Sequence, residues 1–352
     1  MKILNPVFYL LVVCLLSSCN GCNKTNSRAK PDVSNIKTEV KLLRFDRDLM
    51  RMNPQNFQQQ QQQMENTYGS FYNFYLGQFV IGPRPAGDTA DIRQQAVEKF
   101  VADGYTRRLQ DSINRHFNNT TEIEEEINQS LKYFKYYFPD SETPKVVTIN
   151  SGFSIGAFTY DKDVLGIGLD LYLGANNPDY DSAGIYKYLQ HKMHRGFIAR
   201  NAMQVLVNFY FGEEENERDK NLIEAMVEKG KKIYLLSYLL PDAPDSLLVG
   251  FTQTQIDWCQ SSEYEIWKFL NDKDMLYKND FMEKKRYLDE GPTTTGMPAE
   301  APGNIGSWIG LQILRKFEKE TGGEISMRDI MLKYDARTIL QKAKYRPSKT
   351  VF

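Results

Sequence analysis

The chain has 352 residues, of which 41% are hydrophobic and 12% aromatic, enough apolar material for one large domain or two small ones. Its 44 Lys and Arg residues nearly balance 45 Asp and Glu, so the formal net charge is −1. This balance argues against nucleic acid, or an electrostatically attracting membrane surface, as a partner.

The N-terminus has the pattern of an export signal. After Met1 and Lys2, residues 3–16 are almost wholly apolar, too short a stretch to span a bilayer, which takes roughly 20 residues. Leu16-Ser17-Ser18-Cys19 then matches a lipoprotein box, in which the thiol receives a lipid before cleavage. We therefore predict a removed signal at residues 1–18 and a membrane anchor through lipid on Cys19. The alternative is an ordinary secretory signal in which this cysteine is incidental.

The sequence after the signal predicts a tether followed by a single domain without disulfide bonds. Residues 19–35 are rich in Asn, Ser, Lys and Thr, which predicts a flexible tether, and residues 36–352 are expected to form a single domain. Cys14 lies in the signal and Cys22 in the tether. Only Cys259 remains in the body, so no internal disulfide framework is expected and this thiol is interpreted as buried and inert.

The first half of the body is predicted to be mainly helical. Within residues 39–50, Val40, Leu42, Leu43 and Phe45 suggest a short strand leading into the fold. The six glutamines at 58–63 lie between Phe57 and Met64 and are interpreted as the solvated face of a helix. Apolar residues recur at three- and four-residue steps over 92–113 and again over 123–134, up to Pro139, which predicts amphipathic helices.

A small sheet and further helices follow. Residues 146–149 and 158–160 are β-prone, and Asp161-Lys162-Asp163 is expected to turn the chain into 164–173 as an antiparallel hairpin. Helical stripes return over 198–209 and 222–234. Thr252 and Gln255 form a capping-box pattern, and further helices are expected after Gly303. The predicted fold class is helix-rich α+β with one small, largely antiparallel sheet.

The histidines do not form a standard metal site. His191 and His194 are three residues apart, on one side if helical, whereas the common zinc-peptidase motif is His-Glu-x-x-His with a spacing of four. Lys192 stands where that motif has its glutamate, and no third ligand is evident. We interpret both as surface histidines and expect no metal, keeping His191, His194 and Glu228 as weak candidates.

Other catalytic signatures are also missing from the sequence. There is no Gly-x-Ser-x-Gly, no Walker-type loop and no dinucleotide fingerprint around Gly166 and Gly168, so we expect no catalytic residues and no cofactor. Asp161, Asp163 and Asp170 could bind a cation, but the first two suit a turn. Gly306 and Gly310 lie one helical turn apart and are interpreted as a site of close helix packing.

An ordered series of segments resembles one known family. The segments are the lipoprotein box, Phe134–Pro139, Pro144–Phe153, Gly168–Gly174, Gly230–Leu236, Leu240–Asp242, Trp258–Gln260, Glu265–Trp267, Pro302–Gly310 and Lys344–Pro347. In this order they are similar to the gliding-motility lipoprotein family GldB of the Bacteroidota. The resemblance covers nearly the whole chain and implies an envelope protein tied to surface gliding and, through related components, to type IX secretion.

The same resemblance implies a distant likeness to zincin-type metallopeptidases. By order along the chain, the zinc-helix position would be Asn201–Val205, followed by a helix that carries Glu224 and Glu228. The first helix has no histidine, so metal chemistry of that type would be lost. Lipidation, the missing catalytic set and the family resemblance together make the leading expectation a protein that acts by protein–protein contact, without catalysis. A peptidase-like hydrolase with an unrecognised site is one alternative, and a module that binds cell-wall glycan or peptide is another.

The residues after the lipidated cysteine bear on location. Asn20–Lys24 has no acidic run of the kind that sends many lipoproteins of this phylum to the cell surface. The expected location is therefore the outer membrane, with the body on the periplasmic face. The expected partners are the membrane itself and envelope proteins of a gliding or secretion apparatus.

Overall fold

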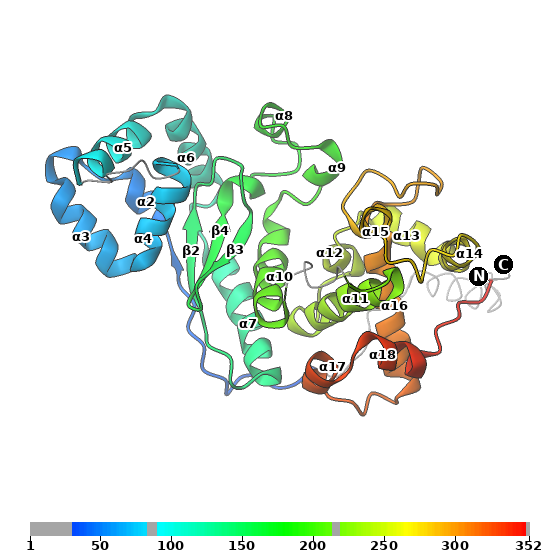
Figure 1. The fold of residues 1–352 in the computed structure, drawn as a ribbon. Coiled ribbons are helices and arrows are strands. Elements are labelled where there is room, and N and C mark those ends of the chain that lie inside the picture. Colours follow the sequence, from blue (N-terminus) through cyan, green and yellow to red (C-terminus); the bar gives the residue numbers. More distant parts are fainter. Residues whose placement is uncertain (1–29, 83–89, 213–218, 350–352) are drawn as a thin grey trace, which may run out of the picture. The chain divides into compact units, whose positions relative to one another are not determined.

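A mixed sheet of four short strands lies within a helix-rich fold (Figure 1). The computed structural model describes residues 30–82, 90–212 and 219–349. The expected α+β class is confirmed. The signal and Cys19 lie outside the described residues. Within the described ranges, no helix is both long and apolar enough to cross a membrane.

The strands are β1 (Leu42–Leu43), β2 (Lys145–Ile149), β3 (Ala157–Tyr160) and β4 (Val164–Gly168), in the spatial order β1-β2-β4-β3. The predicted hairpin is present, since β3 and β4 pair antiparallel. However, β1 pairs with β2, and β2 with β4, in parallel. The sheet is thus mixed and not largely antiparallel. Buried residues run without alternation along β2 and β4, as expected for strands covered on both faces.

The first half of the described chain contributes six helices and two short helical turns. They are α2 (Phe45–Met50), α3 (Phe57–Tyr68), α4 (Ser70–Tyr75), α5 (Ala90–Ala102), α6 (Gly104–His116) and α7 (Thr121–Tyr137), with a 3₁₀ turn η1 (Pro54–Asn56) and a π-helical turn η2 (Leu76–Val80). The glutamine run lies on α3 between buried Phe57 and Met64, as predicted. The stripe over 92–113 is divided between α5 and α6, because the Asp103 carboxylate accepts the Thr106 backbone N–H at 2.7 Å and caps α6.

The second half is almost entirely helical. It contains η3 (Leu169–Tyr172), α8 (Asp179–Ser182), α9 (Lys187–Gln190), η4 (Arg195–Phe197), α10 (Ile198–Phe211), α11 (Leu222–Leu239), α12 (Asp245–Val249), α13 (Gln253–Ser261), α14 (Glu263–Asp272), α15 (Phe281–Leu288), α16 (Ile305–Glu320), α17 (Met327–Lys333) and α18 (Ala336–Ala343). The predicted capping box of Thr252 and Gln255 opens α13.

Two hydrophobic cores share the sheet. Val147, Ile149 and Val164 belong to the core formed with α2–α5, whereas Val146 and Leu165 belong to the larger core that includes α7, α10, α11 and α16. This division follows from the pleat, which sends alternate side chains to opposite faces. Residues 32–352 form one compact unit.

Close helix packing in the larger core depends on glycine. Helices α11 and α16 cross where Gly230 meets Gly310, and a Cβ built on Gly230 would lie 2.3 Å from the Gly310 carbonyl carbon. The interpretation of Gly306 and Gly310 as a close-packing site is confirmed, since both are buried against backbone or side-chain atoms.

Candidate functional site

The structure gives the three weak metal candidates separate partners. His191 follows α9, and its ring nitrogens lie 2.8 Å from the Tyr188 carbonyl oxygen and 3.1 Å from that of Gly250. His194 caps η4 by accepting the Gly196 N–H at 3.2 Å. Glu228, on α11, pairs with Lys231 at 3.4 Å. Nowhere in the described ranges do three His, Cys, Asp or Glu side chains gather as a metal ion would require.

The two histidines also do not share a helix, contrary to the geometry considered for them. His194 is in extended backbone and forms an isolated bridge with Leu173, so the chain straightens between the two residues. The pKa of His194 is lowered by partial burial and, to a lesser degree, by the proximity of His191. Both rings therefore stabilise the connection between α9 and α10.

The positions implied by the zincin likeness carry amides and a capping glutamate. On α10, the Asn201 side chain donates to the Tyr172 hydroxyl at 3.0 Å and Gln204 donates to Asn208 at 3.0 Å. Glu224 closes the capping box at the start of α11 and pairs with Arg337 at 2.6 Å. These groups are engaged with the chain itself.

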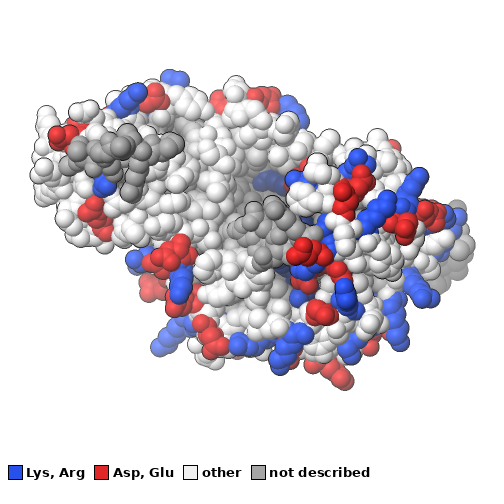
Figure 2. Space-filling model, in the orientation of Figure 1, with Lys and Arg blue, Asp and Glu red and all other residues white. Residues whose placement is uncertain are grey.

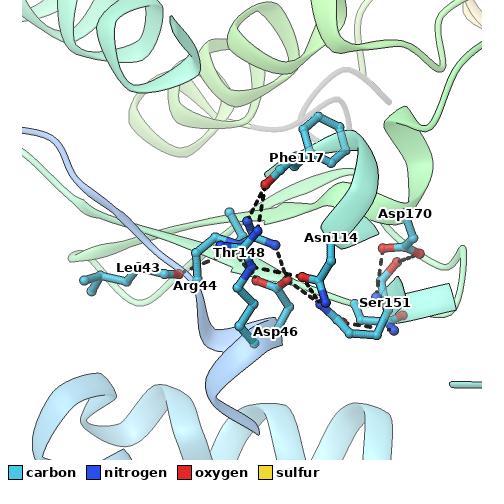
Figure 3. A network of polar contacts seen from close by, with 11 residues as sticks. Leu43, Arg44, Asp46, Asn114, Phe117, Thr148, Ser151 and Asp170 are labelled. Atoms are coloured by element: carbon cyan, nitrogen blue, oxygen red, sulfur yellow. Dashed lines mark hydrogen bonds and ion pairs between the residues drawn. The ribbon is translucent and has the colours of Figure 1, made fainter. Parts of the chain in front are cut away.

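A buried polar network follows the carboxyl ends of the parallel strands (Figure 3). After β1, Arg44 binds Asp46 through two contacts of 2.9 and 2.6 Å, and the Thr148 hydroxyl of β2 donates to the same carboxylate at 2.5 Å. From α6, Gln110 donates to Asp46 at 2.7 Å. The guanidinium also donates to the Phe117 carbonyl at 2.8 Å, so both charges of the pair are hydrogen-bonded.

Asp170, after β4, extends this polar edge. Its carboxylate accepts from the backbone N–H and hydroxyl of Ser151 at 2.9 and 2.8 Å, and from the Phe153 N–H at 2.5 Å. Phe153 has φ +63°, a costly conformation for a side chain of this size. Burial raises the pKa of Asp170, and the three hydrogen bonds oppose that shift.

This edge is where ligands bind in many open α/β sheets. Here its polar groups bond to one another. Asp46 of α2 joins β2 to α6 through Thr148 and Gln110, and Asp170 of η3 holds the loop after β2 through Ser151. The cation site considered at Asp161, Asp163 and Asp170 is not assembled, because Asp170 is buried in this network while Asp161 occupies the hairpin turn with φ +52°. The arrangement serves to hold the fold together.

A second cluster, which the sequence did not reveal, brings together five segments. Lys192 pairs with Glu290 at 2.7 Å, and nearby Arg200 donates to the Leu248 carbonyl at 3.2 and 3.0 Å and to Asn201 at 3.1 Å. The Tyr172 hydroxyl joins through Asn201. We call Tyr172, Lys192, Arg200, Asn201 and Glu290 the Arg200 cluster. Figure 2 shows a hollow with basic side chains at its floor, in the region where α9, α10 and α12 approach one another in Figure 1.

Desolvation dominates the electrostatics of the Arg200 cluster. Burial lowers the pKa of both Lys192 and Arg200, and Glu290 opposes the shift of each. Burial also raises the pKa of the Tyr172 hydroxyl to about 12, so this group stays protonated at neutral pH. In the sequence, Lys192 is notable only because it occupies the glutamate position of the zinc-peptidase motif, and no periodic pattern links residues 172, 192, 200 and 290.

The described residues also contain a surface groove and one buried thiol. A groove of about 420 Å³ lies along α13 and α14, lined by Trp258, Phe269 and Met297 among others. Cys259 is fully buried, and burial raises the pKa of its thiol. It is buried as predicted, in surroundings that disfavour the reactive thiolate.

Fold and sites together define a helix-rich α+β protein whose candidate histidines and buried carboxylates are engaged in internal contacts. The family model described as gliding motility protein GldB matches residues 26–347, nearly the whole chain, and the chain belongs to this family. The resemblance seen in the sequence is thereby confirmed. No curated protein and no solved structure matches the chain.

Proposed function

We propose that this protein is a lipid-anchored component of the bacterial envelope that supports a gliding-motility or type IX secretion machine through protein–protein contacts, without catalysis. The observation that carries the proposal is the lipoprotein box ending at Cys19, placed ahead of a body that belongs to the GldB family from residue 26 onward. The lipid holds the body at the periplasmic face of the outer membrane.

The geometry of the body supports a contact role. The polar groups that would suggest chemistry are used internally, as the partners of His191, His194 and Asp170 show. A buried polar network whose groups are all hydrogen-bonded to one another makes the fold rigid, and it leaves none of those groups available to a substrate. A rigid body on a lipid tether suits a protein that positions other proteins.

The anchor is tested by replacing Cys19 with Ser in the full chain. Without a thiol to acylate, the protein should leave the membrane fraction, while Cys22→Ser should stay in it. Fractionation with a detergent-partition step measures this. Retention of the Cys19→Ser variant in the membrane would show that the signal is not a lipoprotein signal. Protease shaving of intact cells then tests the leaflet, and digestion of the body would place it on the cell surface.

The contact role is tested by a crosslinked pull-down of the lipidated protein from native membranes, with metal content measured on the same sample. Gliding or secretion components in the eluate, without stoichiometric zinc, are the expected result. Zinc at one per chain, lost in His194→Ala and accompanied by peptidase activity, would replace the contact role with the zincin-like enzyme.

One observation favours a second candidate, a module for cell-wall fragments. The groove of about 420 Å³ presents Trp258 and Phe269 beside Glu265 and Lys268, and sugars commonly bind on aromatic faces with polar groups at the rim. A thermal shift with purified cell-wall fragments that disappears in Trp258→Ala would support this candidate. No shift in the parent protein would remove it.

A further inference from the structure

The Arg200 cluster carries more positive than negative charge. Lys192 and Arg200 contribute two positive charges and Glu290 one negative charge, which leaves a net charge of +1 in their immediate surroundings. Glu290 is paired directly with Lys192 at 2.7 Å. Among the described residues, no carboxylate forms an ion pair with Arg200, and its hydrogen bonds go to two neutral groups, the Leu248 carbonyl and the Asn201 amide.

The guanidinium of Arg200 is fixed by the end of α12. Its Nε and one Nη both donate to the Leu248 carbonyl, and the other Nη donates to Asn201. A guanidinium has five N–H groups, so these three bonds leave two for another acceptor. Arg200 is also partly exposed, although its surroundings are dense enough to desolvate it.

The Tyr172 hydroxyl and the space beside Lys192 add to what the Arg200 guanidinium offers a ligand. The Tyr172 hydroxyl accepts from Asn201, so its own proton is free to be donated in a further hydrogen bond. Gly250 lies against Lys192, and a Cβ at that position would meet Nζ at 3.3 Å, so the absence of a side chain there leaves room around the ammonium group. The cluster therefore combines a prearranged guanidinium, an ammonium and a hydroxyl donor.

We propose that the Arg200 cluster is a binding site for a single carboxylate group, presented by a ligand that enters the hollow and is bound by Arg200 and Lys192. A singly charged, planar carboxylate matches both the excess charge of +1 and the flat donor pair of a guanidinium. Inorganic phosphate carries more than one negative charge at neutral pH, which exceeds the net charge of +1 on the cluster. This site is separate from the lipid anchor and from the groove beside Trp258.

The test uses the full lipidated protein in detergent micelles and titration calorimetry. The probe is N-acetyl-dialanine with a free carboxylate, compared with its C-terminal amide, with glucuronate as a sugar acid, and with inorganic phosphate. One desolvated ion pair supports dissociation constants of about 1 to 10 mM. Binding of the peptide acid but not the amide is expected. Glucuronate binding in addition would identify a sugar acid as a second source of the same group.

Charge variants make the assignment specific. Lys192→Gln and Arg200→Gln should each weaken binding by at least about tenfold, the loss of one charge-assisted contact. Arg195→Gln is the matched control, because this exposed arginine on the same segment pairs with Glu122 and Glu126 and should change nothing. Arg200→Gln also removes two hydrogen bonds to the Leu248 carbonyl of α12, so the fold of this variant is checked by circular dichroism. If that variant is misfolded, the result for Lys192→Gln decides the test.

Glu290→Gln provides a result in the opposite direction. It removes a half-exposed counter-ion and raises the local charge from +1 to +2, so carboxylate binding should tighten several-fold. The proposal is overturned if neither carboxylate probe binds, if phosphate binds while both carboxylates do not, or if Glu290→Gln leaves the affinity unchanged. None of these results would bear on whether Cys19 is lipidated or which proteins are recovered with the chain.

Discussion

Asp46 accepts contacts from Arg44, Gln110 and Thr148, and its side chain is fully shielded from solvent. Burying an ion pair costs desolvation of both charges, so such a pair contributes little when intact. Removing one member is different, because the other charge then remains buried without a counter-ion. At this residue the network therefore works as a constraint on how β1, α2 and α6 fit together.

The first prediction concerns this pair. Asp46→Ala should lower the free energy of unfolding by about 3–5 kcal/mol, since the Arg44 guanidinium would be left in the interior. Urea unfolding measures the loss. The control is Asp289→Ala, which breaks an exposed pair with Lys285 and should cost no more than about 1 kcal/mol. Equal losses in both variants would mean that the network is not a structural constraint.

A second prediction at this scale concerns acid stability. The hydrogen bond from Arg337 lowers the pKa of Glu224 below its ordinary value of 4.5. The folded chain then binds a proton less readily than the unfolded chain. The stabilisation is present above pH 4.5 and is lost as the pH falls through the lower folded pKa.

Glu224→Gln should therefore flatten the acid limb of the stability–pH curve below pH 4.5, while the glutamine preserves the capping box with Asn221. Arg337→Gln removes the same pair from the other side and should flatten the same limb. Thermal midpoints between pH 3 and 7 measure both. If both variants keep the parent slope, the pair does not control acid stability.

At the scale of elements, periodicity predicted most of the helices but little of the sheet pairing. The helix α7 ends before Pro139 and α13 begins at its capping box, since both depend on local contacts. A short strand was expected where β1 lies, but nothing in the sequence indicates that β1 pairs in parallel with β2, which joins Leu42 to Val146. Such pairing is decided by long-range packing.

The same reason explains what was missed at the sites. Asp46, Gln110 and Thr148 meet only because three elements converge, and the Arg200 cluster likewise draws on residues from four segments. The sequence did identify Gly306 and Gly310 as a site of close helix packing, because that pattern is a local spacing of one helical turn. Side chains that come into contact from distant parts of the chain have no characteristic spacing in the sequence, so a sequence pattern cannot predict their contact.

That crossing gives the prediction at this scale. A Cβ on Gly310 would lie 1.9 Å from the Met226 carbonyl oxygen, a backbone atom that cannot move without separating α11 and α16. Gly310→Ala should destabilise the protein by about 2–3 kcal/mol or more, measured by urea unfolding. The control is Gly77→Ala, where no atom lies within 4 Å and a gain of up to about 1 kcal/mol is expected. A neutral Gly310→Ala would show that the helices can separate at little cost.

At the scale of the whole molecule, the stability of the body depends on its first strand, β1, because residues in and before β1 pack into both cores, one on each face of the sheet. Val33 and Leu42 are buried in the larger core, and Leu43 packs against the smaller one. Arg44, which follows that strand, holds the buried carboxylate of Asp46. The body therefore needs its residues from about 32 onward.

Two truncated chains test where the independent body begins. A chain that starts at Asp32 keeps Val33, β1 and Arg44, so it should unfold at the same temperature as the full lipidated protein and remain in the soluble fraction. A chain that starts at Phe45 lacks the β1 pairing with β2 and leaves Asp46 buried without its guanidinium. It should fail to give a cooperative transition. Scanning calorimetry and sedimentation compare them. If the shorter chain melts like the longer one, β1 is not required for the body to fold. If the longer chain also fails to give a cooperative transition, the tether or the lipid contributes to folding.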